Sequence, residues 1–139
     1  MHATTSLLGR AGLSLIFIIS GWGKLAAYAG TQQYMESMGV PGALLPLVIA
    51  LELGGGLLLL AGGFTRLLAI GLGAFWLLAG ILFHGDLADP MQAILFWKNV
   101  AIAGGLALLA ANGAGALSLD AWLARSADPA GDDRPLPAV

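Results

Sequence analysis

Long apolar stretches, interrupted by short groups of glycine, proline and charged residues, dominate the pattern of this chain. Four of them reach the length of about 20 residues that a helix needs to cross a bilayer, and none shows the alternation of a barrel strand. The pattern therefore predicts an all-α membrane protein, a four-transmembrane-helix bundle with antiparallel up-down topology. The expected spans are roughly Leu7–Tyr28, Ala43–Gly62, Thr65–Phe83 and Met91–Ala111.

Turn-forming residues separate these stretches. The connection Gly62–Gly63 is so short that spans two and three are expected to form a tight hairpin. The first stretch also resembles a cleavable signal peptide, with Arg10 before the apolar run and Ala-Tyr-Ala at 27–29. A retained span is the favoured interpretation, because Lys24 would lie just before the cleavage site.

Composition supports an integral membrane protein and narrows its chemistry. Of the 139 residues 58% are hydrophobic and only 10% are charged, against roughly 25% charged in soluble domains. A net charge of −2 with six basic residues argues against a nucleic-acid partner. The absence of cysteine excludes disulfides, thiolate metal sites and CxxC redox chemistry, and two histidines are too few for a His-rich metal site. The expected partner is the lipid bilayer.

The distribution of basic residues predicts the orientation. Short loops rich in Lys and Arg stay on the cytoplasmic side. With the N-terminus inside, that side holds Arg10, Arg66, Arg125 and Arg134, and the outer side holds Lys24. We therefore expect both termini in the cytoplasm, with Arg10 and Arg66 anchored at the cytoplasmic head groups.

The chain after the fourth span divides into two parts. Ser118 or Asp120 is expected to cap a short helix at the membrane interface, at about residues 118–125. Residues 126–139 contain three prolines and charges of both signs, which is typical of a disordered tail. Residues 1–125 are thus expected to form one transmembrane domain.

Polar residues inside the predicted spans lie in the same half of the bilayer. At ~1.5 Å per residue, Lys24 lies about 6 Å, Glu52 about 14 Å, and Lys98 with Asn99 about 11 to 12 Å from the outer ends of their spans, while His84 caps the outer end of span three. All five fall in the outer half of the bilayer. Intramembrane ionisable groups are candidates for function. The candidate ligand-binding or proton-carrying residues are therefore Lys24, Glu52, His84, Lys98 and Asn99.

Glu52 needs a partner, because an unpaired carboxylate at this depth costs several kcal/mol. Lys98 matches its depth best, and Lys24 is the competing partner. The pair either belongs to a polar cleft open toward the outer side, with Glu52 at its floor, or simply fixes which helices face each other. Trp22 and Trp97 are candidates to flank a ligand ring, although such positions are more often interfacial belts.

The motifs that carry these residues resemble the DoxX family. They are RAGLSLIFIISGWGKL at 10–25, ELGGG at 52–56, GGFTRLLAIGL at 62–72, FWKNVAIAGGLALL at 96–109 and GALSLDAWL at 115–123. The resemblance implies a multi-pass protein of the bacterial inner membrane. The family name is associated with terminal oxidase and thiosulfate:quinone oxidoreductase subunits, and many members are called oxidoreductases without a demonstrated reaction.

Two functions remain open from the resemblance and the residues. One is a redox-associated subunit that binds a quinone or similar amphipathic ligand, with no covalently bound cofactor and a redox-enzyme subunit as its partner. The other is a non-catalytic membrane partner or assembly factor, because relatives of the superfamily include cargo receptors and assembly chaperones. Catalysis itself is left open. A transporter is less favoured, since the chain shows no repeat and no pair of broken helices.

Overall fold

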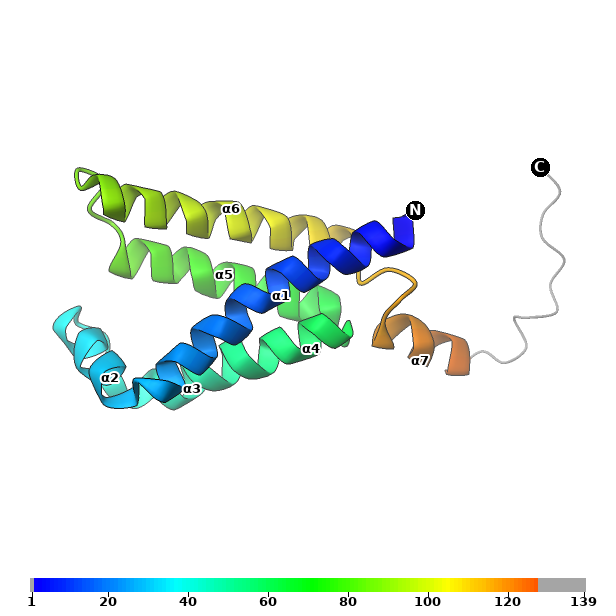
Figure 1. Ribbon diagram of the computed structural model, residues 1–139, viewed down its shortest axis with the longest axis horizontal. Helices are drawn as coiled ribbons and strands as arrows, with labels where there is room; N and C mark the ends of the chain where they lie inside the picture. Colours follow the sequence, from blue (N-terminus) through cyan, green and yellow to red (C-terminus); the bar gives the residue numbers. More distant parts are fainter. Residues whose placement is uncertain (1, 128–139) are drawn as a thin grey trace, which may run out of the picture.

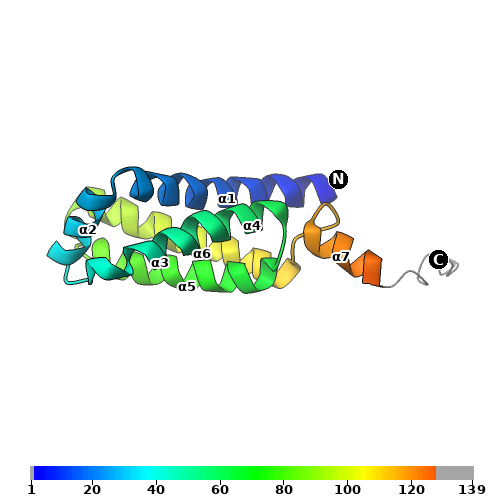
Figure 2. The ribbon, with the colours of Figure 1, turned by 90° about the horizontal axis from the view of Figure 1, so that it is seen from below.

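Helices make up all the regular structure of the part of the chain that the computed structural model describes, residues 2–127 (Figure 1). Four helical segments are long and apolar enough to span a membrane, which confirms the predicted four-helix fold. They are α1 (His2–Ala26), the composite second span (Gly42–Ala61), α5 (Thr65–Phe83) and α6 (Pro90–Asn112). α1 begins and α7 (Leu119–Ala127) lies at the same end of the bundle (Figure 2). Which side of the membrane this end faces stays a prediction.

The first span and the first connection differ from the expected ones. α1 begins at His2 and ends at Ala26, and the chain then turns at Ala27 into a separate short helix, α2 (Tyr28–Ser37). The sequence predicted a connection here because of its glycines. Met35 of α2 is nevertheless buried against Leu45 and Ile49, and this contact holds α2 against the second span.

The second span is assembled from four consecutive helical pieces. A 3₁₀ turn, η1 (Gly42–Leu44), leads into α3 (Leu45–Ile49), a π-helical segment, η2 (Ala50–Gly54), and α4 (Gly55–Ala61). π segments are rare insertions into α-helices and are frequent at functional sites. This one contains the intramembrane glutamate, Glu52.

Glycines allow α1 to pack closely on the second span. A Cβ added at Gly21 would lie only 2.7 Å from the backbone nitrogen of Leu53, and one added at Gly56 would lie 3.0 Å from the Cβ of Phe17. Real side chains do not tolerate the first of these distances. The two backbones are therefore in direct contact at η2.

The core lies in the half of the bundle that holds the start of α1. It consists of Phe17, Leu59, Ala69, Leu72, Trp76, Leu106 and Leu109, which come from all four spans. The rings of Phe17 and Trp76 meet edge to face, with centroids 5.0 Å apart, a favoured aromatic geometry. The four spans are thus joined firmly at this level.

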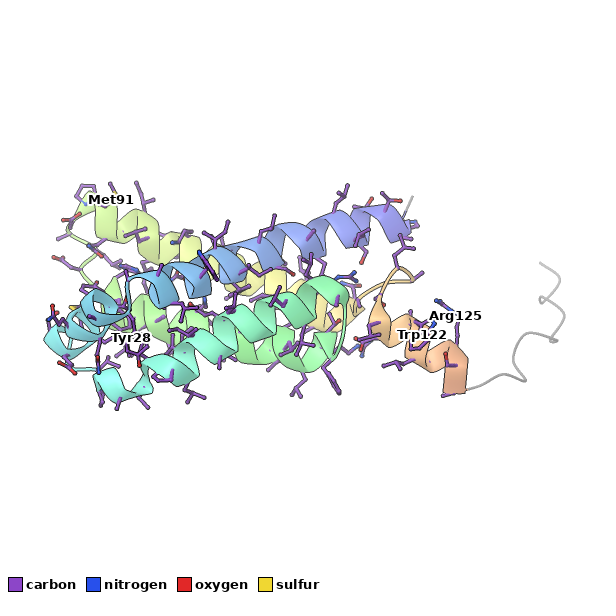
Figure 3. The ribbon with its side chains drawn as sticks, turned by 60° about the horizontal axis from the view of Figure 1, so that its bottom comes forward. Tyr28, Met91, Trp122 and Arg125 are labelled. Carbon is purple, nitrogen blue, oxygen red and sulfur yellow. The ribbon has the colours of Figure 1, made fainter. Side chains whose placement is uncertain are left out.

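The four spans form two pairs that diverge toward α2. α1 contacts mainly α4 and η2, whereas α5 contacts mainly α6. Figure 1 shows the pairs close together near α4 and well apart near α2 and α3. Of the labelled side chains, Tyr28 and Met91 lie at the α2 end, and Trp122 and Arg125 lie on α7 at the other (Figure 3).

A network of buried hydrogen bonds ties the chain together at the end opposite α2. Arg10 is only 2% exposed, and its guanidinium donates to the carbonyl oxygens of Ala114 and Leu117, to the latter at 2.8 Å. The Asp120 carboxylate accepts from the amides of Phe64 at 2.8 Å and Thr65 at 3.0 Å. We call Arg10, Asp120 and these four backbone partners the Arg10 clamp.

The clamp corrects two expectations. Arg10 is not a head-group anchor, because its charge is used to bind the chain that follows α6, whereas Arg66 is exposed as expected. Asp120 caps the start of α5 across the fold, and Ser118 caps α7 by accepting from the Ala121 amide at 3.2 Å. α7 extends through Ala127, and the rest of the predicted tail, 128–139, lies outside the described residues.

Acid should weaken this end of the protein. Burial alone would raise the pKa of Asp120, but hydrogen bonds from Thr65 and Phe64 and the charge of Arg10 outweigh it and hold the pKa below its ordinary 3.8. Because the folded-state pKa is depressed, the stabilisation is complete above the ordinary value and is lost as pH falls through the folded value.

We expect Asp120→Asn to cost about 1 kcal/mol at neutral pH, as for a lost helix cap, and to flatten the acid part of the stability profile. Unfolding in mild detergent from neutral pH down to about pH 3 measures both effects. The same acid slope in parent and variant would show that another carboxylate is responsible.

Candidate ligand site in the membrane

Glu52 is paired with Lys24. Its side chain is 3% exposed, and its carboxylate accepts a hydrogen bond from the Lys24 ammonium at 2.7 Å. The same ammonium donates to the Ser20 hydroxyl at 2.7 Å. The preference for Lys98 as the partner was wrong, and the competing lysine is the correct one. The reason is that α1 packs directly on η2 at Gly21, whereas Lys98 lies on α6.

A cavity of about 350 Å³ lies beside this ion pair. Most of its wall is apolar, and it falls at the small end of the ~300–1,000 Å³ range of ligand pockets. All five polar residues singled out in the sequence line it, together with residues of every span and of α2. Its wall consists of Ser20, Lys24, Thr31, Tyr34, Met35, Val40, Leu44, Val48, Glu52, Phe75, Trp76, Leu78, Ala79, Leu82, Phe83, His84, Lys98 and Asn99.

The cavity follows from the divergence of the two helix pairs. Leu44 and Val48 line it from the second span, and Leu78 and Leu82 line it from α5. Three of these, Leu44, Leu78 and Leu82, are also exposed on the outside of the bundle. These three exposed leucines give the cavity an apolar rim between η1–α3 and α5.

The two aromatic candidates lie away from the cavity, as the favoured interfacial interpretation expects. Trp22 is 63% exposed and Trp97 is 60% exposed, and neither is among the residues that line the cavity. Trp76 lines it instead. Its position was visible in the sequence: Ala69, Gly73, Trp76 and Gly80 follow helical spacing along one face of α5, and small residues on that face let α6 approach.

Lys98 and Asn99 present unpaired polar groups at the cavity. The Lys98 ammonium lies 5.6 Å from the centroid of the Trp76 ring, within reach of a cation–π interaction. Within residues 2–127 it forms no ion pair. Asn99 is 5% exposed and packs against Gly80, and its amide has no hydrogen-bond partner in the described part of the chain.

His84 closes the α2 end of the cavity wall. It follows the last residue of α5, and its Nδ1 lies 2.8 Å from the Gln92 side-chain oxygen on α6. Because an amide oxygen can only accept, Nδ1 is the donor in this contact. Nowhere in residues 2–127 do three His, Cys, Asp or Glu side chains gather as metal ligands do.

Comparison with known proteins identifies the family. The family model of DoxX matches residues 5–85, which include all but the first turn of α1, the whole second span and α5, and thus Lys24, Glu52 and His84.

The chain belongs to the DoxX family.

Two relatives locate this DoxX protein in the cell. It is 51% identical to the inner membrane protein YqjF of Escherichia coli K12 over 117 residues, which cover 84% of this chain and 90% of that protein. It is 42% identical to the inner membrane protein YphA of the same strain over 122 residues, with coverages of 82% and 86%. No solved structure matches the chain. Together with its four spans, these relatives make it a multi-pass protein of the bacterial inner membrane.

Proposed function

We propose that this DoxX protein binds the polar head group of an amphipathic, lipid-soluble molecule in the cavity beside Glu52. One observation carries the proposal: one cavity with an apolar rim is lined by all five polar residues that the sequence places in the spans, Lys24, Glu52, His84, Lys98 and Asn99. Polar groups that served only to hold helices together would be paired with one another. Lys98 and Asn99 instead line the cavity without an ion-pair or hydrogen-bond partner in the described residues.

A quinone is the first candidate for the ligand. Its two carbonyl oxygens need hydrogen-bond donors, and the Lys98 ammonium and the Asn99 amide supply them from adjacent positions on α6. Trp76 and Phe75 supply an aromatic wall, and the apolar opening suits an isoprenoid tail. When bound, a quinone would supply redox chemistry. The Lys24–Glu52 pair would then be the protein's own group for holding a proton beside the head group.

A second function has one observation in its favour. The Lys24–Glu52 hydrogen bond joins α1 to η2 without any ligand, as a link that only fixes the two helices would. A non-catalytic partner or assembly factor of a redox enzyme needs nothing more. The two functions differ in whether the cavity takes up a small molecule.

Fluorescence quenching of Trp76 tests the proposal. In a variant with Trp22, Trp97 and Trp122 replaced by phenylalanine, Trp76 reports from the cavity wall. A short-chain quinone added in mild detergent should quench it saturably. Ala79→Phe, which fills the cavity, should weaken binding at least about tenfold, whereas Ala74→Phe on the exposed face of α5 should not.

Comparison with the control variant Ala74→Phe decides whether the quinone binds in the cavity. Quenching that rises linearly, or that is the same in the two phenylalanine variants, would mean that the quinone reaches Trp76 only from the lipid. Together with purification of the protein in a fixed ratio with another membrane protein, that result would favour the assembly-factor function.

A further inference from the structure

The charges around the cavity do not cancel. Among the described residues that line it, Glu52 is the single acid, and Lys24 and Lys98 are the two lysines. Lys24 already neutralises Glu52 at 2.7 Å. The positive charge of Lys98 therefore has no acid left in this lining to balance it.

The Lys98 side chain is exposed, but its ammonium turns toward the Trp76 ring on the neighbouring span. Long lysine side chains near helix ends normally extend to the head groups. Here the ammonium lies over the ring of Trp76, which is seven residues before the end of α5 at Phe83, a depth of roughly 10 Å. A cation at that depth is costly unless it is paired.

Cation–π attraction alone is a weak substitute for a counter-charge. A charge-assisted hydrogen bond between an ammonium and an anionic oxygen is roughly twice as strong as one between neutral groups. The Asn99 amide beside it is a second donor for the same oxygen atoms, and Asn99 is 5% exposed, so it is shielded from water.

We propose that the head group bound in this cavity carries one negative charge, which pairs with Lys98. This inference rests on the proposed function and specifies its ligand as a lipid-soluble acid. The apolar opening through Leu44, Leu78 and Leu82 takes the apolar part of that molecule. The required chemistry is found in a fatty acid, in a quinone with an ionised ring hydroxyl, and in an acidic phospholipid.

The single-Trp76 variant tests the charge with matched probes. Bromine on an acyl chain quenches tryptophan on contact, so a brominated fatty acid is compared with its neutral methyl ester, at a pH where the acid is ionised. We expect the acid to bind at least about tenfold more tightly than the ester. Lys98→Met should abolish this preference, and Lys98→Arg should keep it, because arginine restores the charge.

Brominated phosphatidylglycerol and phosphatidylcholine form a second pair of probes. Stronger quenching by the acidic lipid alone would identify a phospholipid as the source of the charge, and stronger quenching by the fatty acid alone would identify a free acid. Saturable but equal binding of acid and ester would overturn the charge selection and leave the pocket intact. A preference that survives in Lys98→Met would also overturn it. If no probe binds saturably, the cavity is not a ligand-binding site, and the proposed function is contradicted as well.

Discussion

Replacing Lys24 with methionine is expected to destabilise the protein by about 3–5 kcal/mol, the usual cost of stranding one partner of a buried ion pair. The reason is the position of Glu52, whose side chain is 3% exposed and whose recorded partner in the described part of the chain is this lysine. The substitution keeps the length and apolar contacts of the side chain. Unfolding by a graded fraction of SDS in mixed micelles measures the loss.

The opposite substitution should do less harm. Glu52→Gln leaves an ammonium whose side chain is 27% exposed and which keeps its hydrogen bond to Ser20, so we expect a loss of about 1–2 kcal/mol. The double variant Lys24→Met with Glu52→Gln should recover much of the loss of the lysine variant. Lys98→Met combined with Glu52→Gln is the matched control and should recover nothing. Additive losses in the first double variant would show that the pair is not coupled.

Replacing Arg10 with methionine should cost about 2–5 kcal/mol. The change leaves the Leu117 carbonyl oxygen without its donor and the Ala114 oxygen with only the Ser6 hydroxyl at 3.3 Å, at about 1–3 kcal/mol for each buried group that loses its partner. It also removes the positive charge that lowers the pKa of Asp120. Thermal unfolding in mild detergent, followed by far-UV circular dichroism, measures the effect.

Arg66 provides the control for this prediction. It is an exposed arginine at the same end of the bundle, so Arg66→Met should change stability by less than about 0.5 kcal/mol. Equal losses in the two variants would mean that any arginine at this end acts through the head groups, and that the clamp contributes little.

The fold was predictable because a bilayer leaves so few choices. A segment of about 20 apolar residues must satisfy its backbone internally, and four such segments separated by turn residues leave a helical bundle. The depth of each polar residue can be counted along its helix, and this count predicted that Glu52 and the two lysines lie near one another. In the structure all five polar candidates line one cavity.

What depth cannot supply is which helix lies beside which. Depth favoured Lys98, but the contact of Gly21 with Leu53 places Lys24 beside Glu52. Trp22 and Trp97 were candidates to flank a ligand ring, but both are exposed, and Trp76 lines the cavity instead. Arg10 was misread as a head-group anchor because its partners, the carbonyl groups of Ala114 and Leu117, are 104 and 107 residues away in the sequence.

α2 was missed because Gly30 within it, and Gly39, Pro41 and Gly42 just after it, indicated a turn. It is a short helix with little amphipathic pattern of its own, and it is held mainly by Met35 against the second span. Stability from such a tertiary contact leaves no periodic signal in the sequence.

The clamp and the cavity lie at opposite ends of the same helices, with Arg10 and Lys24 fourteen residues, or roughly 21 Å, apart on α1. Mutations more than about 10 Å apart usually act independently. A chain built in this way can exchange residues at Leu44, Leu78 or Lys98 and acquire a different ligand while the clamp and the core keep it folded. The end of the bundle that holds the cavity can therefore change its ligand specificity during evolution. The Arg10 clamp at the other end keeps the protein folded while it does so.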